Sequence, residues 1–362
     1  MRLVALRRVD PGAVLAQDVH TGRHGNAPLL VRGVVLDRRR VAALERAGIH
    51  AVYVDDQLGR GIEVAQAISD ETRARATAAL DTAFKRQFAP ETLSELHDVA
   101  RLIAEEIAGS GDVIVALQDL GAADAYTLQH SIDVAAVGLL IARRLFHERG
   151  WVGYRRERRF DNIEERLVQL GLGLMLHDVG KLIVPTEVLN RAGGLDAEEW
   201  ELVRRHPLAG LDLLASAGLT WVTRSVIRSH HERWDGGGYP SGKAGEAIPQ
   251  FARIAAVADV YDAITSERPY SRAREAHEGW REIVNGASSA FDPEVVSVFR
   301  RVVAPYPPGS EIVLGDGRRG IVVGFPSSDL ERPRVRVAWD ARGRPVEPYE
   351  IDLAELPETR AA

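Results

Sequence analysis

The 362-residue sequence contains no cysteine, which excludes disulfides, zinc ribbons and thiol nucleophiles. Any metal site must therefore use histidine, aspartate and glutamate, a donor set that suits iron, manganese, zinc or magnesium better than soft metals. No apolar run approaches the roughly 18 residues of a membrane span. The first residues, Met1–Arg8, are too few and too charged for a signal peptide. The sequence thus predicts a cytoplasmic protein without a membrane segment.

Lysine is also scarce, because arginine supplies all but three of the 46 basic residues. Those three are Lys85, Lys181 and Lys243. The net charge of -6 gives no reason to expect DNA binding. A hydrophobic fraction of 45% with 27% charged residues is ordinary for a globular protein, and the length suggests about two or three domains.

The hydrophobic pattern predicts a multidomain, mainly α chain. Short apolar runs between glycine and proline turns indicate a small β-rich module at the N-terminus, and a similar pattern indicates a small β domain at the C-terminus. The long middle region has apolar residues at three- and four-residue spacing, which predicts an all-α helical bundle. The expected divisions are a regulatory or packing module at 1–57, a linker with connecting helices at 58–111, the catalytic bundle at 112–305, and the C-terminal β domain at 306–362.

Two local signals predict helix boundaries. Asp37 is placed to cap a short helix that Gly48 ends. Ala89-Pro90 divides the connecting region into two helices, because proline disfavours a helical residue before it.

The run Leu172–Ile183 is apolar at nearly every position, yet it contains His177, Asp178 and Lys181. Buried polar groups are costly unless they are compensated, and a metal ion compensates both an imidazole and a carboxylate. Taken alone, the run also fits an amphipathic core helix with a polar end.

Similar polar residues interrupt other apolar helix patterns, so that five helical segments carry five histidines and two aspartates. Helical bundles build metal sites from inward-facing side chains on facing helices. Seven ligands exceed the need of one tetrahedral ion and suit two octahedral ions, with Asp178 able to bridge them. The candidates are His130, His177, Asp178, His206, His230, His231 and Asp259.

Three ordered motifs carry a resemblance to a known family. They are His177-Asp-Val-Gly-Lys181, the segment His230–Pro240, and Arg268-Pro-Tyr270. They resemble the HD-GYP family, a branch of the HD-domain phosphohydrolases, and the resemblance covers roughly residues 112–303. It implies hydrolysis of the bacterial second messenger cyclic di-GMP to pGpG or GMP, on a multinuclear centre that often contains iron or manganese.

The resemblance also implies roles for individual residues. The seven candidates become metal ligands, Asp178 and Lys181 become catalytic, and Lys181 and Arg268 hold a phosphate. The loop Gly238-Tyr239-Pro240 shapes the pocket beside the metals. Glu232 either orients a ligand histidine or faces solvent. Family members with a third metal have a glutamate four residues before the first histidine, where this chain has Tyr126, so we expect two metals per subunit.

The mechanism that follows is attack on the phosphodiester by a hydroxide bridging two metals. One rival is an HD hydrolase of another nucleotide, such as cyclic GMP-AMP. Another is a catalytically weak sensor or docking protein that binds cyclic di-GMP. Further hypotheses are a diguanylate cyclase partner that docks on the Gly-Tyr-Pro loop, and a homodimer.

Overall fold

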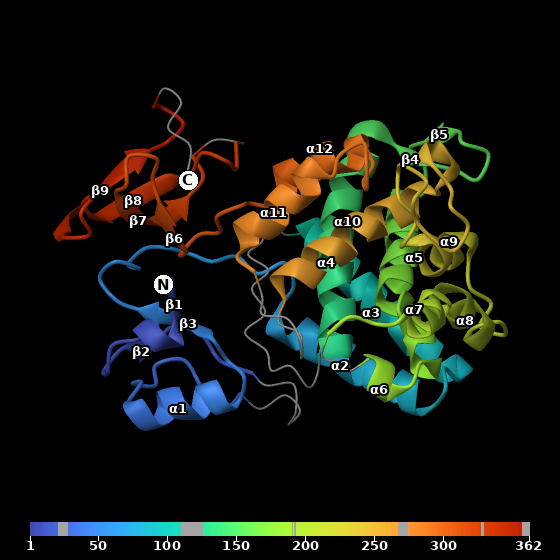
Figure 1. The fold of residues 1–362 in the computed structure, drawn as a ribbon, viewed down its shortest axis with the longest axis horizontal. Coiled ribbons are helices and arrows are strands. Elements are labelled where there is room, and N and C mark those ends of the chain that lie inside the picture. The colour runs from blue at the N-terminus through green and yellow to red at the C-terminus, as the bar shows by residue number, and fades with distance from the viewer. Residues whose placement is uncertain are drawn as a thin grey trace.

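The computed structural model describes the chain with gaps. The described residues are 1–20, 28–109, 126–189, 191, 193–266, 274–326 and 329–356. About half of this part of the chain is helical, and it has small sheets near both ends (Figure 1). None of its helices is long and apolar enough to span a membrane.

The N-terminal module contains an antiparallel sheet with strand order β1-β3-β2. Its strands are β1 (Arg2–Ala5), β2 (Val14–Leu15) and β3 (Ala51–Asp55), and helix α1 (Arg38–Arg46) packs beside them. The Asp37 carboxylate accepts a hydrogen bond from Arg40 N at 2.7 Å, and Gly48 has a φ of 81° just beyond the helix. Both predicted boundaries of this helix are confirmed.

The helical body has α5 at its centre, packed against α3, α4 and α9. Its helices are α2 (Asp70–Lys85), α3 (Pro90–Gly109), α4 (Tyr126–Arg149), α5 (Ile163–Leu176), α6 (Thr186–Leu189), α7 (Ala197–Arg204), α8 (His206–Leu213), α9 (Trp221–Ser229), α10 (Gln250–Thr265), α11 (Ala276–Asn285) and α12 (Pro293–Val302). The predicted break at Ala89-Pro90 separates α2 from α3. Buried side chains of α2 and α3 belong to the same hydrophobic core as those of α4, α5 and α10, so these helices do more than connect two modules.

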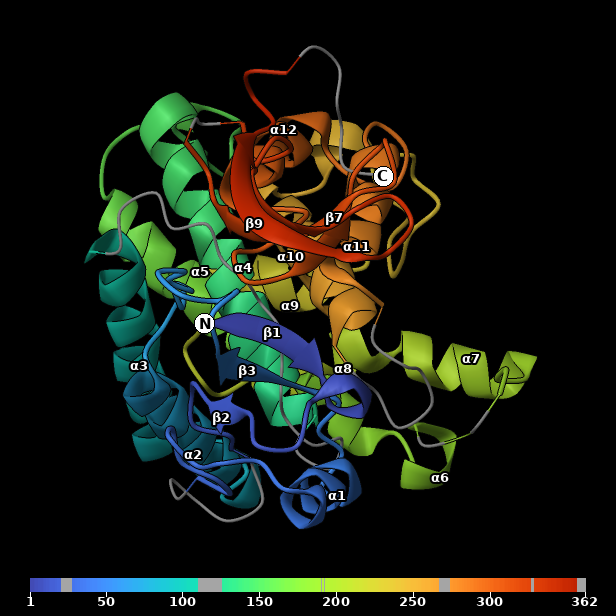
Figure 2. The same cartoon turned by 90° about the vertical axis from the view of Figure 1, so that its left-hand side faces the viewer.

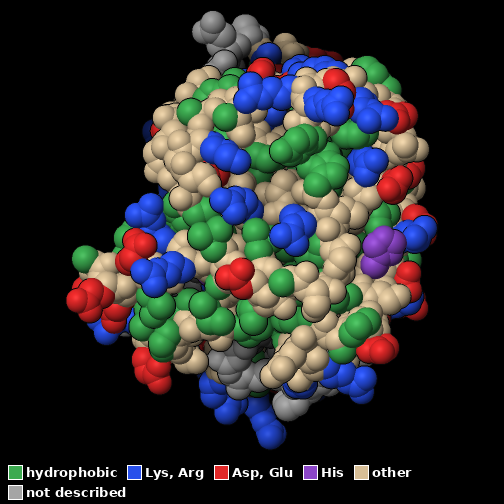
Figure 3. All heavy atoms as spheres, turned by 90° about the vertical axis from the view of Figure 1, so that its right-hand side faces the viewer, with side chains coloured by type: hydrophobic (Ala, Val, Ile, Leu, Met, Phe, Trp, Pro, Cys, Tyr) green, Lys and Arg blue, Asp and Glu red, His purple; other side chains and the backbone are tan. Residues whose placement is uncertain are grey.

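The body is not entirely helical, in contrast to the predicted all-α bundle. Strands β4 (Trp151–Val152) and β5 (Arg158–Arg159) pair as a hairpin between α4 and α5. Trp151 anchors it, because its buried indole donates to Asp161 O at 2.7 Å. The hairpin lies at the upper end of the molecule in Figure 1. Lys and Arg side chains gather at this same upper end in Figure 3.

The C-terminal sheet is an antiparallel meander with strand order β6-β7-β8-β9. Its strands are β6 (Glu311–Val313), β7 (Arg319–Gly324), β8 (Arg334–Trp339) and β9 (Pro345–Asp352). Leu3 N donates to Gly309 O at 2.9 Å, and Arg336 Nη1 donates to Leu58 O at 2.7 Å. These bonds join the two end modules, which lie side by side in Figures 1 and 2.

Candidate metal centre

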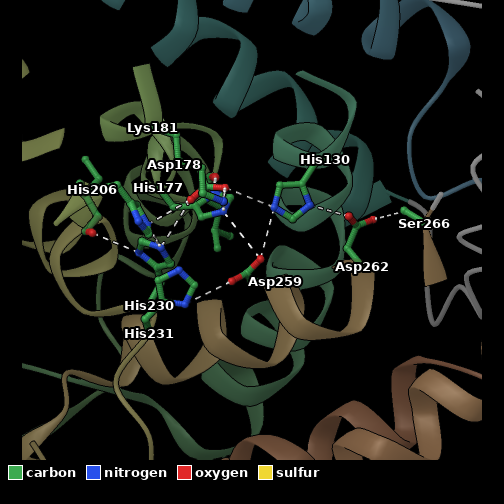
Figure 4. A network of polar contacts seen from close by, with 12 residues as sticks. His130, His177, Asp178, Lys181, His206, His230, His231, Asp259, Asp262 and Ser266 are labelled. Atoms are coloured by element: carbon green, nitrogen blue, oxygen red, sulfur yellow. Dashed lines mark hydrogen bonds and ion pairs between the residues drawn. The ribbon is translucent and has the colours of Figure 1, made fainter. Parts of the chain in front are cut away.

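Five helical segments bring the seven predicted ligands together (Figure 4). His130 lies in α4 and Asp259 in α10. The other five lie where helices begin or end: His177 and Asp178 follow α5, His206 opens α8, and His230 and His231 follow α9. Side chains at helix ends from different directions can converge on one point, which explains how distant segments meet here. That these residues ligate metal stays a prediction.

The candidate ligand atoms form two groups, in each of which they lie within 4.8 Å of one another. One group is Asp178, His206, His230 and His231, and the other is His130, His177 and Asp259. Asp178 lies between the groups: its Oδ1 is 3.2 Å from His206 Nε2, and its Oδ2 is 3.4 Å from His177 Nε2. This arrangement gives one carboxylate oxygen to each group, as a bridging ligand requires.

Backbone carbonyls orient three of the histidine rings, His177, His206 and His230. Their Nδ1 partners are, in turn, Leu174 O at 2.7 Å, Val203 O at 2.8 Å, and both Val226 O and Ile227 O at 3.1 Å. A carbonyl only accepts hydrogen bonds, so each Nδ1 carries the hydrogen and each Nε2 presents a lone pair to the cluster.

Two of these lone pairs face each other, because His206 Nε2 and His230 Nε2 are only 3.1 Å apart. If both rings are neutral, a hydrogen bond between them would remove the Nδ1 hydrogen from one ring and set a lone pair against a carbonyl. In addition, His177 Nε2 and Asp178 Oδ1 are buried with no hydrogen-bond partner. Buried polar atoms rarely stay unsatisfied. Divalent cations at the two groups would satisfy all four atoms, so the residues fit metal ions.

The fourth ring, His130, is oriented by a carboxylate that the sequence analysis did not assign. Asp262 Oδ2 lies 2.6 Å from His130 Nδ1, and Ser266 Oγ donates to Asp262 Oδ1 at 2.9 Å. Asp262 follows Asp259 by three residues, which puts both on one face of α10. This spacing could have identified Asp262 from the sequence, because metal-bound histidines usually donate their second ring N–H to a carboxylate, a backbone carbonyl or water.

The electrostatics keep most of the site in a state that can bind a cation. Burial lowers the pKa of His231 to about 4, against the opposing charge of Asp259. Burial and the neighbouring imidazoles lower the pKa of His230 as well. Burial alone would raise the pKa of Asp178, but Lys181 and His177 outweigh it and hold that pKa well below its usual range. Neutral imidazoles and ionised carboxylates are the forms that ligate metals.

His130 is the exception, because its pKa is raised to about 9. Burial lowers this pKa, but the hydrogen bonds that His130 donates to Asp259 and Asp262, together with the charges of these carboxylates, outweigh the effect of burial. The proton on His130 offsets the negative charge of two buried carboxylates. A bound cation would do the same and leave His130 neutral, as a ligand must be.

The Gly-Tyr-Pro loop packs directly on the cluster. A Cβ added at Gly238 would lie 2.3 Å from Arg233 N and 2.5 Å from His231 O, so only glycine fits there. Tyr239 N donates to His231 O at 3.1 Å, and the rings of Tyr239 and His231 lie 4.7 Å apart. Gly238 thus lets the loop reach His231.

Glu232 has neither of the two roles expected from the sequence. Its side chain is buried, and its carboxylate accepts hydrogen bonds from Ser241 N at 2.8 Å and Lys243 N at 3.0 Å. It therefore holds the end of the Gly-Tyr-Pro loop, and both predictions for it are wrong.

The structure describes only one of the two predicted phosphate contacts. Lys181 Nζ lies 2.5 Å from Asp178 Oδ2, and its side chain is 31% exposed at the edge of the cluster. Arg268 lies outside the described residues, as does the side chain of Tyr126. The expected absence of a third metal therefore stays a prediction.

Comparisons with known proteins identify the family. The HD domain family matches residues 154–295. A protein of Pseudomonas aeruginosa named cyclic di-GMP phosphodiesterase is 35% identical over 290 residues, 79% of this chain and 66% of the relative. The chain belongs to the HD-GYP family.

Two further proteins extend the comparison. A Vibrio cholerae protein named 3'3'-cGAMP-specific phosphodiesterase 2 is 36% identical over 125 residues, 34% of the HD-GYP chain described here and 24% of that relative. An HDG"Y"P protein of Bdellovibrio bacteriovorus has a similar fold, with a TM-score of 0.52 at 13% identity, over 82% of this chain and 97% of the other. The chain thus spans 66% or less of the length of these two curated relatives.

Proposed function

We propose that this protein is a metal-dependent phosphodiesterase that hydrolyses cyclic di-GMP to pGpG, GMP or both. The observation that carries the proposal is the pair of facing Nε2 atoms of His206 and His230, 3.1 Å apart, beside the unpartnered Oδ1 of Asp178. Such a cluster is costly to bury unless a cation occupies it. The cyclic di-GMP phosphodiesterase named among the relatives supports the choice of substrate.

Two divalent ions, iron or manganese, are the proposed cofactors. His206, His230 and His231 would hold one, His130, His177 and Asp259 the other, and Asp178 would bridge them. Nitrogen and carboxylate donors without thiolate suit these metals. When bound, the ions would neutralise phosphate charge and make a hydroxide nucleophile available near neutral pH.

Lys181 is the proposed contact to a substrate phosphate. Its ammonium group has three donors, of which one is directed at Asp178 Oδ2, so the others can reach a phosphate oxygen as charge develops there. Gly180 sets its position, because an added Cβ would lie 1.9 Å from His206 O and push the turn of Lys181 away from α8. Arg268 is the proposed second phosphate contact.

Tyr239 is proposed to shape the pocket beside the metals together with Gly238 and Pro240. Burial raises the pKa of Tyr239, and the charges of Asp178 and Asp259 raise it further. The phenol therefore keeps its proton and can donate a hydrogen bond to a substrate oxygen.

A second candidate substrate is 3'3'-cGAMP, favoured by the name of the Vibrio cholerae relative. The test is anaerobic purification with metal analysis, loading with Fe(II) or Mn(II), turnover of both cyclic dinucleotides, and chromatography of the products. Release of pGpG or GMP from cyclic di-GMP at the higher kcat/KM supports the proposal. A higher kcat/KM for 3'3'-cGAMP selects the second candidate, and metal-loaded protein that cleaves neither overturns both.

A further inference from the structure

We propose that Trp200 and Arg204 of α7 form the subsite for a guanine base of the substrate. This inference rests on the proposed function, because it extends the metal centre to the part of cyclic di-GMP that carries its chemical identity. A phosphodiester is common to all cyclic dinucleotides. Recognition of the base must therefore come from residues beside the metal cluster.

Tyr239 connects α7 to the cluster. On its cluster side, the ring of Tyr239 lies 4.7 Å from that of His231. Toward α7, its ring centre lies 5.1 Å from the guanidinium carbon of Arg204 and 6.4 Å from the ring of Trp200. Trp200 and Arg204 are four residues apart, which places both on one face of their helix. A substrate phosphate at the cluster would thus have these two side chains within reach of its base.

Trp200 offers a surface for stacking. Its side chain is 49% exposed, although a large aromatic ring is usually well covered. Helices α6 and α7 project from the body of the molecule in Figure 2, which explains the exposure. Aromatic side chains stack on nucleic acid bases whatever the sequence, so Trp200 would contribute affinity but little selectivity.

Arg204 offers the selectivity. Its guanidinium lies over the Tyr239 ring, and within the described part of the chain no carboxylate or carbonyl accepts a hydrogen bond from it. The neighbouring Arg205 differs, because its Nε lies 3.9 Å from Glu201. A guanidinium pairs with the O6 and N7 acceptors of guanine, whereas adenine presents an amino donor at the equivalent position. Arg204 is therefore suited to favour guanine over adenine.

The test compares Arg204→Met and Trp200→Ala with the matched control Arg205→Met, all in the metal-loaded full chain. Arg205 carries the same charge directly after α7, and its Nε is directed at Glu201. The substrates are cyclic di-GMP, cyclic di-AMP and bis(p-nitrophenyl) phosphate, the last of which has no base. Metal content of each variant is measured in parallel.

We expect Arg204→Met to reduce the preference for cyclic di-GMP over cyclic di-AMP by about 10- to 100-fold, the discrimination that a bidentate arginine–guanine pair provides. Trp200→Ala should raise KM for both cyclic dinucleotides by about 10-fold and leave that preference unchanged. Arg205→Met should alter neither quantity. In both α7 variants, kcat/KM for cyclic di-GMP should fall relative to that for bis(p-nitrophenyl) phosphate.

Two outcomes would overturn the subsite. One is an unchanged base preference in Arg204→Met. The other is an equal loss on bis(p-nitrophenyl) phosphate, which would show that Arg204 only supports the loop of Tyr239. Wild-type protein that cleaves bis(p-nitrophenyl) phosphate but no cyclic dinucleotide would instead refute the proposed function. In that case, pGpG binding measured by calorimetry tests the subsite. Weaker binding by Arg204→Met than by the wild type supports the subsite, and equal binding excludes it.

Discussion

Two buried carboxylates in the same domain, Asp178 and Glu232, show how differently a chain can treat the same functional group. Both are nearly inaccessible, with exposures of 5% and 2%. Glu232 has two backbone N–H partners, from Ser241 and Lys243, one for each oxygen. Asp178 instead faces imidazoles, and its Oδ1 has no hydrogen-bond partner. The first carboxylate is satisfied by the protein itself, whereas the second needs something that the chain does not supply.

This difference separates a structural polar group from a functional one better than burial does. Satisfied buried groups stabilise one conformation, and unsatisfied ones persist only where another requirement maintains them. In this protein the unsatisfied atoms converge on one point, which is what a metal centre requires. The comparison predicts that substitutions at Asp178 reduce turnover and metal binding. Substitutions at Glu232 should instead alter how firmly the Gly-Tyr-Pro loop is held.

The largest effect is expected for Asp178→Asn, which removes the charge and the second anionic oxygen that would bridge two ions. We expect a loss of turnover beyond the roughly 10²–10³-fold that removal of one stabilising donor costs. Metal content should also fall below that of the wild type. Asp212→Asn, an exposed change on α8, is the control. Full activity with an unchanged metal content in Asp178→Asn would show that Asp178 does not bridge.

The next largest effect is expected on the free energy of unfolding when metal is added to the purified protein. An ion that binds only the folded protein, and not the unfolded chain, raises the free energy of unfolding by about 2.7 kcal/mol when its concentration is 100-fold above Kd. Urea unfolding curves with Mn(II) and with a chelator measure this difference. Because Asp178→Asn should lose most of it, that variant is the control. Coincident curves for the wild type would contradict the prediction that the cluster binds a cation.

A smaller effect is expected for Asp262→Asn, since Asp262 positions His130 without belonging to the cluster. Loss of such a supporting carboxylate typically costs about 10–100-fold in metal affinity or activity. Metal titration measures the affinity directly. Ser266→Ala removes only one hydrogen bond to Asp262 and should cost less. Equal affinities for wild type and Asp262→Asn would limit the role of Asp262 to packing.

Much of this fold was predictable because local signals determine it. Asp37, Gly48 and the Ala89-Pro90 break act through neighbouring backbone, and the structure follows all three. The hydrophobic pattern also indicated helices in the middle and sheets at the ends. The pattern could not show that α2 and α3 share the core of the body, because packing between helices depends on contacts distant in sequence.

The site was predictable to the extent that polar residues interrupt apolar helices. That signal selects His130, His177 and Asp259, each of which lies in or beside a buried helical segment. It does not select Asp262, whose partner His130 lies 132 residues away. It also misassigns Glu232, because hydrogen bonds to backbone N–H groups leave no trace in residue identity. The roles of supporting residues therefore required the structure.

The smallest effect is expected for Glu232→Gln, which tests the other side of the comparison. Glutamine retains one acceptor oxygen but turns an amide donor toward the second backbone N–H, leaving that group unpaired. We expect a loss of about 1 kcal/mol in the free energy of unfolding, the lower end of the usual range because this loop is only partly buried. Metal affinity should stay unchanged, whereas KM should rise because the Gly-Tyr-Pro loop is held less firmly. Glu246→Gln, an exposed change of the same charge, is the control for both measurements. If Glu232→Gln instead lost metal at unchanged stability, Glu232 would belong with Asp178 among the groups that the metal centre requires.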